Sequence, residues 1–523
     1  MPQFAVDIIE SKMRLRSSTC REPAVKGCRR GDDCSVIAGI LAYLTANLFQ
    51  RSFVPVLLSG DQVFFWMDAQ RLLHGDRIYR DFFQFTGPGT DLVYLVAFHL
   101  FGLHIWVTNL VVLMLGAIFG WTCFRIGTRI LTRPMAFLVT ALIVVVLYGR
   151  LLNATHHWFS ELLVLMAALV LMGGKDPRRV MSAGSLLGAA AFFTQSRGPF
   201  AALAIASYFL WEGVRTHSSW RTVFRRMVFL ACPMILTWLV LSSYFIATLG
   251  WRQIWYWQVT YVLHYQVHDH EHWGLPNHFA WKEISFHGQV LTVYLMLPVA
   301  YGLSVWQAWC RRHEPPAQIE EARELLTLVG IASALEVAQS PSWLRVYCVA
   351  APGILLAGWL VGKLRDQRYA TRALWAIVLC LALQQIRTRH QTESVVVKMP
   401  AGTASMSDLN ARKFEWIEEH TRPDDYFFQA PWPGVYLPLH LRNPMFAEGF
   451  RRDDLARPEF VTQAIRQLDD RQVQYVLWSP RLDLPEPLEN PSSYHLAPFR
   501  DFLHRRYQKV RTFPDGDEIW QRR

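Results

Sequence analysis

Long apolar runs recur along most of this chain, and they restrict its fold more than any other feature. Each run is long enough, or nearly long enough, to cross the hydrocarbon core of a bilayer. We count about eleven, at residues 36–58, 104–124, 134–149, 158–173, 180–195, 198–213, 227–249, 289–309, 325–339, 343–362 and 371–386. This pattern predicts a polytopic α-helical membrane protein. The amphipathic stretch 90–103 is too short to span and predicts a helix lying at the membrane surface.

Composition and charge agree with a membrane location. Only 18% of the 523 residues are charged, against roughly 25% in soluble chains. Arginines and lysines gather in every second loop, while the loops between them carry mostly single cations, namely Arg150, Arg197 and Arg345. Because basic loops stay in the cytoplasm, this alternation places the N-terminus inside the cell. It also accounts for the net charge of +11 without a nucleic-acid partner.

The polar C-terminal part predicts a separate folded unit. An odd number of spans puts it outside the cytoplasm, and its two helix-then-strand patterns predict a small α/β domain. We therefore divide the chain into a cytoplasmic N-terminal segment (1–34), a transmembrane domain (35–386) and a periplasmic α/β domain (387–523). The transmembrane domain carries two larger outer loops, at 59–103 and 250–288.

The first outer loop holds the most specific motif. It opens with Asp61 at the membrane surface, continues through the amphipathic helix "FFWMDAQRLLHG" and ends in the turn "YRDFFQFTGPG". An aspartate in this position either ends the preceding helix at the lipid headgroups or acts as a functional acid. The ordered turn that follows favours a functional acid, because it fixes Asp61 and Asp81 between membrane and water.

This loop resembles the first external loop of the GT-C glycosyltransferases, of the protein O-mannosyltransferase and aminoarabinose-transferase kind. The resemblance rests on "GDQ", "AQRLLHG", "YRDFFQFTGPG" and "YLVAFHLFG", and within bacteria it is greatest to the RgtABCD-like membrane proteins. The chain departs from the family pattern twice. Gln62 stands where the family has a second acid, and Gly87-Pro88 replaces a Pro-Pro pair.

The resemblance implies an enzyme that moves a sugar from a polyprenyl-phosphate donor to a lipid, glycan or protein acceptor. The reaction takes place on the outer face of the cell inner membrane. Asp61 would be the catalytic base. The remaining candidates would order the loop or bind the acceptor (Asp81, Gln62 and Tyr79) or hold the donor phosphate (Arg197, Arg345 and Arg150). The three arginines have an alternative explanation, which is that they reach for lipid headgroups.

Further polar residues lie near the predicted outer surface. His156, His157 and Glu161 stand at the mouth of one span, and Glu336 lies one turn below the surface of another, so all four are cavity candidates. Glu161 is either functional or paired with His157, one helical turn earlier. No cofactor is required by the sequence. A cluster in the second large loop either binds a divalent cation or is simply solvated: His268, Asp269, His270 and His272.

Two other functions remain open at this level. A transporter or flippase for lipid-linked saccharides would place its ionisable residues at mid-membrane, whereas here they lie near the outer surface. A catalytically inactive GT-C-like assembly protein is the second alternative, and Gln62 in place of an acid is its best support. The chain shows no phosphate-cradling P-loop and no dinucleotide-binding fingerprint.

Overall fold

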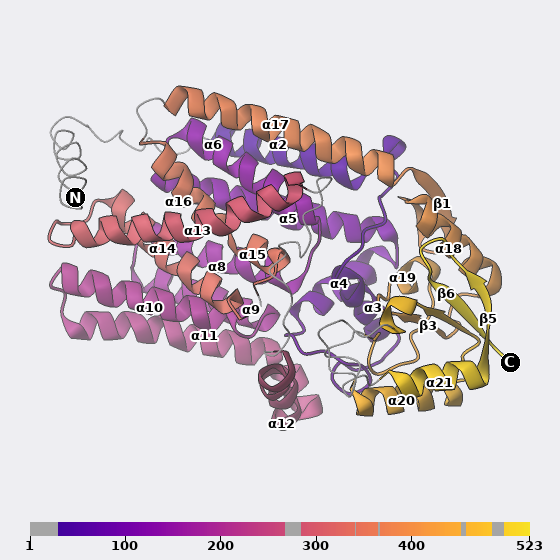
Figure 1. Cartoon of the computed structure of the whole chain (residues 1–523). Coiled ribbons are helices and arrows are strands. Elements are labelled where there is room, and N and C mark those ends of the chain that lie inside the picture. Colours follow the sequence, from indigo (N-terminus) through magenta and orange to yellow (C-terminus); the bar gives the residue numbers. More distant parts are fainter. Residues whose placement is uncertain (1–29, 267–283, 340, 364–366, 451–456, 484–495) are drawn as a thin grey trace, which may run out of the picture.

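The computed structural model describes residues 30–266, 284–339, 341–363, 367–450, 457–483 and 496–523. A bundle of long helices forms most of the molecule, and an α/β domain covers one end of it (Figure 1). The short helices α3 (Gln62–Leu73) and α4 (Gly89–Phe101) lie between the two parts. The first outer loop is therefore enclosed by the bundle and the C-terminal domain.

The bundle helices follow the predicted apolar runs. They are α2 (Arg30–Leu48), α5 (Ile105–Ile130), α6 (Arg133–Leu142) continued by η2 (Ile143–Tyr148) and α7 (Gly149–Leu151), α8 (His156–Met172), α9 (Pro177–Phe193), α10 (Arg197–Arg215), α11 (Trp220–Leu249), α13 (Ile284–Cys310), α14 (Gln318–Val337), α15 (Trp343–Val349), α16 (Ala351–Val361) and α17 (Gln367–Thr392). Among the described residues, five helices are long and apolar enough to cross a membrane, or six if the bent pair α15 and α16 counts as one span. The total of about eleven spans stays a prediction.

The first predicted segment ends earlier than its apolar composition indicates. Helix α2 stops at Leu48, and the following residues form the short turn η1 (Arg51–Phe53) and an extended strand-like segment. That segment pairs with the C-terminal domain, since Val56 forms a parallel bridge with Ser405 and the Leu57 N–H donates to the Ser405 carbonyl. The prediction of one helix over 36–58 is therefore wrong beyond residue 48, because a distant strand satisfies this backbone instead.

The outer helices agree better with the sequence. Helix α4 confirms the predicted amphipathic helix over 90–103, and α3 confirms the one within "FFWMDAQRLLHG". After α11 the chain continues through α12 (Trp251–Trp255) and the π-helix η3 (Tyr256–Gln266). The predicted cation-binding cluster (His268, Asp269, His270 and His272) lies outside the described residues.

The C-terminal domain is built on two small sheets. Strands β1 (Val395–Met399) and β2 (Gly402–Met406) form an antiparallel hairpin. A four-stranded sheet has the order β3-β4-β6-β5, in which β3 and β4 are parallel and the other pairs antiparallel. The strands of this sheet are β3 (Phe427–Ala430), β4 (Tyr475–Trp478), β5 (Tyr507–Thr512) and β6 (Glu518–Arg522). The helices of the domain are α18 (Asp408–His420), α19 (Tyr436–Leu439), α20 (Pro458–Asp470), η5 (Pro480–Asp483) and α21 (Ala497–Arg506).

The domain and the first outer loop share one hydrophobic core. Met67 of α3 and Ile105 of α5 are buried in the same cluster as the side chains of the β1–β2 hairpin and α18. Backbone and side-chain hydrogen bonds reinforce this packing: the Phe83 N–H donates to the Phe446 carbonyl, and the Gln70 amide donates to the Leu441 carbonyl at 3.1 Å. The loop that carries Asp61 is thus packed directly against the domain.

The opposite end of the bundle collects the basic loops. Ion pairs there link loops that are far apart in sequence, such as Arg125 with Asp33 at 3.0 Å and Lys175 with both Glu212 and Glu321 at 2.7 and 2.8 Å. The sequence predicts these loops to share the cytoplasmic side, and the structure brings them to one end. Which side of the membrane that end occupies stays a prediction.

Candidate functional site

Asp61 is the residue immediately before helix α3. Its carboxylate does not cap the helix, because it accepts no hydrogen bond from the first helical N–H groups. Four residues later, the Phe65 ring contacts the His156 ring edge-on at a centroid distance of 5.9 Å. The start of α3 therefore lies against the start of α8, so Asp61 stands beside the predicted cavity residues.

Gln62 supports the chain next to this position. Its amide N–H group donates to the Ser59 carbonyl at 3.0 Å and to the Leu152 carbonyl at 3.4 Å, and its amide oxygen accepts from the Ala154 N–H at 3.3 Å. A carboxylate has no N–H group to donate. The amide therefore performs a supporting role that the acid of the family pattern could not perform in this loop.

A buried ion triad lies behind this surface. The Arg197 guanidinium contacts Glu161 at 3.0 Å and Glu336 at 2.8 Å, and all three side chains are almost fully buried. Two serine hydroxyls complete the carboxylate bonding, Ser333 to Glu161 at 3.2 Å and Ser196 to Glu336 at 2.5 Å. The triad thus holds two acids on a single cation.

Close packing of helices fixes the arginine. Gly198, the next residue, faces α9 so closely that a Cβ atom would lie 2.2 Å from the Leu187 carbonyl oxygen. The tight α9–α10 hairpin predicted at Arg197 is present. Its side chain, however, turns into the bundle and meets the two glutamates, so the phosphate-binding role predicted for Arg197 stays untested.

The two histidines line the same region. His156 Nδ1 lies 2.9 Å from the Thr194 hydroxyl, which in turn donates to Ser160 at 3.0 Å. The ring centroids of His156 and His157 lie 3.9 Å apart, with the ring planes tilted by 38°. The alternative pairing of His157 with Glu161 is wrong: His157 Nδ1 has no partner among the described residues, and Glu161 bonds Arg197 instead.

The remaining arginines face this group. Both histidines lie within electrostatic range of Arg197 and Arg345, and Tyr347 lies within range of Arg150. Cys348 is influenced by the charges of Asp61, Arg197 and both glutamates. The structure therefore brings these predicted residues into one neighbourhood: Asp61, Arg150, Arg345, His156, His157, Glu161, Arg197 and Glu336.

Tyr79 and Asp81 occupy a different part of the loop. The Tyr79 hydroxyl donates to the Thr86 carbonyl at 2.6 Å and accepts from Gln258 at 2.9 Å. Asp81 accepts from the Arg77 N–H at 2.8 Å and pairs with the neighbouring Arg80. Both residues bond within the outer loops, a geometry suited to the loop-ordering role rather than to acceptor contact.

Close packing against the end of α9 explains the two glycines of the Gly-Pro-Gly turn. A Cβ atom on Gly87 would lie 2.0 Å from the Phe192 carbonyl oxygen, and one on Gly89 would lie 2.8 Å from the Phe193 ring. Only glycine allows this approach to the end of α9. The turn thereby seats the first outer loop against the helix that leads to Arg197.

Sequence reasoning missed a second buried acid cluster. Asp68 and Asp91 are fully buried and Glu448 is 3% exposed. The three carboxyls lie within electrostatic range of one another, and Asp68 interacts with both of the others. Burial, followed by the charge of the neighbouring acid, raises the pKa of Asp68 and of Asp91 well above the usual range. Burial raises the pKa of Glu448 to about 7. Asp68 lies seven residues after Asp61, on the same helical face, and this spacing was the available signal.

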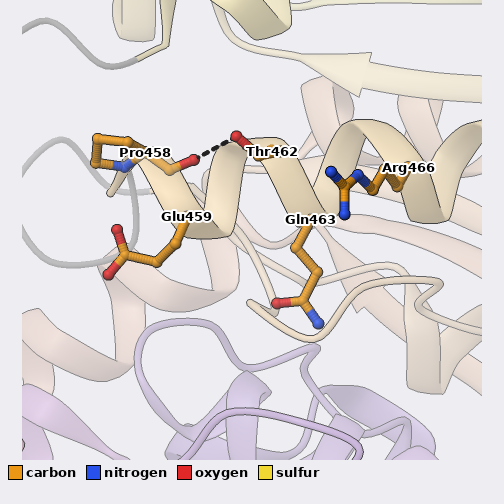
Figure 2. Close-up of a pocket in the computed structure, with 5 residues that line it drawn as sticks. All are labelled: Pro458, Glu459, Thr462, Gln463 and Arg466. Carbon is orange, nitrogen blue, oxygen red and sulfur yellow. Dashed lines mark hydrogen bonds between the residues drawn. The ribbon is translucent and has the colours of Figure 1, made fainter.

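Two negative observations limit other sites. No group of three or more potential metal ligands occurs in the described part of the chain. A surface hollow of about 680 Å³ lies along α20, lined by Pro458, Glu459, Thr462, Gln463 and Arg466 (Figure 2). One helix supplies all of its lining residues and none of the predicted site residues, so we do not assign the chemistry to it.

Comparison with known proteins identifies the fold. No protein-family model matches the sequence, and no curated protein matches it. ArnT from Cupriavidus metallidurans in the apo state is similar, with a TM-score of 0.57 and 14% identity over 94% of this chain and 97% of ArnT. The same enzyme bound to undecaprenyl phosphate gives 0.56 and 14%, over 94% and 98%.

A second enzyme extends the similarity. The oligosaccharyltransferase of Archaeoglobus fulgidus in its apo form gives a TM-score of 0.52 and 12% identity, over 95% of this chain and 75% of that one. Identities this low establish a shared fold and nothing finer. Both proteins are GT-C glycosyltransferases, and this chain therefore has the GT-C fold that its first outer loop predicts.

Proposed function

We propose that this protein is a membrane glycosyltransferase that moves a sugar from a polyprenyl-phosphate donor to an acceptor on the outer face of the inner membrane. The fold supports a lipid-linked donor, since ArnT of the same fold is seen with undecaprenyl phosphate. The observation that carries the proposal is the common neighbourhood of Asp61, two arginines and the buried triad.

In the proposed reaction, Asp61 accepts the proton of an acceptor hydroxyl as its oxygen attacks the anomeric carbon of the sugar. The bond between that carbon and the phosphate oxygen breaks, and polyprenyl phosphate leaves with its electron pair. Arg150 and Arg345 provide the positive charge that stabilises the departing phosphate, because guanidinium groups bind phosphate oxygens in pairs.

The other residues act through position. Arg197 holds Glu161 and Glu336 beneath the site, and Gln62 fixes the chain around Leu152 and Ala154 near Arg150. The periplasmic domain closes the first outer loop from above and would meet the acceptor, which is a lipid, a glycan or a protein. The inner-membrane location and a cytoplasmic N-terminus complete the proposal.

Asp61→Asn is the decisive variant. It should retain the melting behaviour of the wild type and lose sugar transfer by about 100-fold or more, as expected when a general base is removed. The assay uses a radiolabelled polyprenyl-phosphate sugar with inverted and right-side-out membranes. Asp408→Asn, which removes an exposed acid of the C-terminal domain paired with Arg412, is the matched control.

The same assay separates the alternatives. Normal transfer by Asp61→Asn contradicts the proposal. Movement of labelled lipid between leaflets without any transfer indicates a transporter, and the absence of both activities in the wild type indicates an inactive assembly protein.

A further inference from the structure

The contact between the C-terminal domain and the first outer loop contains three acids and few donors. Asp68 comes from α3, Asp91 from α4 and Glu448 from the segment after β3 that packs on α3. Among the described residues, no N–H or hydroxyl group donates to Asp68 Oδ1, to either oxygen of Asp91 or to Glu448 Oε1. Buried acceptors without donors are costly, on the order of 1–3 kcal/mol each.

The nearby cation does not compensate for these acids directly. Arg71 is buried, and its guanidinium donates to Asp76 at 2.9 Å, to the Met445 carbonyl at 2.6 Å and to the Asp81 carbonyl at 2.9 Å. Three of its five N–H donors are therefore engaged elsewhere, and Arg71 acts on Asp68 and Glu448 through its charge. Gln84 provides one N–H to Asp68 Oδ2, at 3.3 Å.

The remaining groups around the cluster are neutral tyrosines. Tyr79 lies within electrostatic range of Asp68 and Asp91, and Tyr436 of α19 within range of Glu448 and Arg71. Burial raises the pKa of both phenols, so they carry no charge near neutrality. Among the described residues, the charged groups that act on the cluster from the packed elements are thus the three acids themselves and Arg71.

We propose that protons fasten the C-terminal domain to the first outer loop: carboxyl–carboxyl hydrogen bonds among Asp68, Asp91 and Glu448 hold the contact at acidic and neutral pH and release it as the pH rises. A carboxyl that carries a proton is the donor that the unsatisfied oxygens lack. When the protons leave, like charges face one another in a buried space.

The direction of the pH effect follows from linkage. Glu448 has a pKa of about 7 in the folded protein, above the ordinary value near 4.3 for glutamate. A raised folded-state pKa gives stability that is complete below the unfolded value and is lost as the pH rises through the folded value. The contact should therefore weaken as the pH rises from about 4.5 through 7. Loss of the protons of Asp68 and Asp91, whose pKa values burial also raises, should weaken it further.

The contact includes the loop that begins with Asp61. Segment 441–448 bonds α3 and the following turn at several points, namely Gln70 to Leu441, Arg71 to Met445 and Phe83 to Phe446. Release of this segment would free the outer side of α3. If the proposed function holds, the pH outside the cytoplasm then regulates transfer by controlling how the domain covers the site.

Hydrogen exchange on the full chain in nanodiscs tests the proposal. Exchange of segments 441–448 and 62–73, corrected for the intrinsic pH dependence of amide exchange, should rise about tenfold or more from pH 6 to pH 8, since each released proton contributes up to tenfold per pH unit. Glu448→Gln and Asp68→Asn keep polar groups in place without titrating and should flatten this profile. Glu459→Gln, on exposed α20 of the same domain (Figure 2), should retain it.

Three results would overturn the proposal: a flat wild-type profile, an unchanged profile in Glu448→Gln, or a profile abolished by Ca²⁺ or Mg²⁺ and restored by a chelator. The last would mean that a cation, rather than protons, joins the acids. The Asp61→Asn variant keeps the two proposals distinguishable. Hydrogen exchange of segments 441–448 and 62–73 in this variant should follow the wild-type pH profile whether or not the variant transfers sugar.

Discussion

Two groups of buried acids in the described part of the molecule, one in the bundle and one at the domain contact, are neutralised in different ways. In the bundle, Glu161 and Glu336 share the Arg197 guanidinium at 3.0 and 2.8 Å. At the domain contact, three carboxyls meet without a cation that donates to them, because Arg71 bonds Asp76 and two carbonyls. The comparison teaches that burial alone does not decide the charge of an acid. In the bundle a fixed guanidinium supplies the opposite charge for both acids, whereas at the domain contact protons are left to neutralise the carboxyls.

Removing the cation from the first group should have the largest effect. Arg197→Gln leaves two buried acids without a compensating charge, and breaking a buried ion pair in this way costs about 3–5 kcal/mol. We expect a large drop in the thermal midpoint of the detergent-purified protein. Arg179→Gln, which breaks an exposed pair with Asp176 at 3.2 Å, is the control and should change stability by less than about 1 kcal/mol. If both variants melt alike, the triad does not hold the bundle together.

The helices of the bundle could be predicted because their signal is local. An apolar run identifies a helix without knowledge of its neighbours, as the α9–α10 hairpin around Arg197 shows. The end of α2 could not be predicted in the same way. Gln50, Arg51 and Pro55 interrupt the apolar run after Leu48, but the pairing of the following residues with the strand containing Ser405 gives no local signal. Long-range pairing decided that boundary.

The candidate site also has features that follow from local sequence signals and features that depend on long-range packing. The order of spans places Asp61, Arg345 and Glu161 at the same predicted side of the membrane, so their common neighbourhood could be predicted. The choice of partners could not: Glu161, Arg197 and Glu336 meet through helix packing across 175 residues of chain. Glu448 carried no signal at all, since nothing in its local sequence indicates that a buried segment faces two distant aspartates.

The turn that joins the two regions offers an intermediate test. Gly87→Ala would push a Cβ atom to 2.0 Å from the Phe192 carbonyl oxygen, so either the first outer loop or the end of α9 must shift. Overpacking of this kind costs about 1–3 kcal/mol. Gly434→Ala, where no atom lies within 4 Å, should be tolerated.

The measurement for this pair is the thermal midpoint together with exchange of segment 62–73. A loss of stability confined to the outer loop would show that the two acid clusters are mechanically independent. A loss that also exposes the N-terminal part of α10, near Arg197, would show that they are coupled. An unchanged midpoint in Gly87→Ala would contradict the close packing of the turn.

The variant with the smallest expected effect, Glu448→Gln, discriminates most directly between neutralisation by a guanidinium and neutralisation by protons. At pH 8 the pH lies above the pKa of Glu448 in the wild type, which is about 7. The side chain must then either ionise in a buried site or bind a proton, and each costs free energy of folding. Glu448→Gln removes that cost, so it should raise the thermal midpoint at pH 8 by an amount equivalent to about 1 kcal/mol, where one pKa unit corresponds to about 1.4 kcal/mol. At pH 5 both side chains are neutral, and the difference should vanish. If the variant is destabilised equally at both pH values, Glu448 makes a fixed pairing in the folded protein, as the triad glutamates do with Arg197. The distinction between the two clusters would then fail.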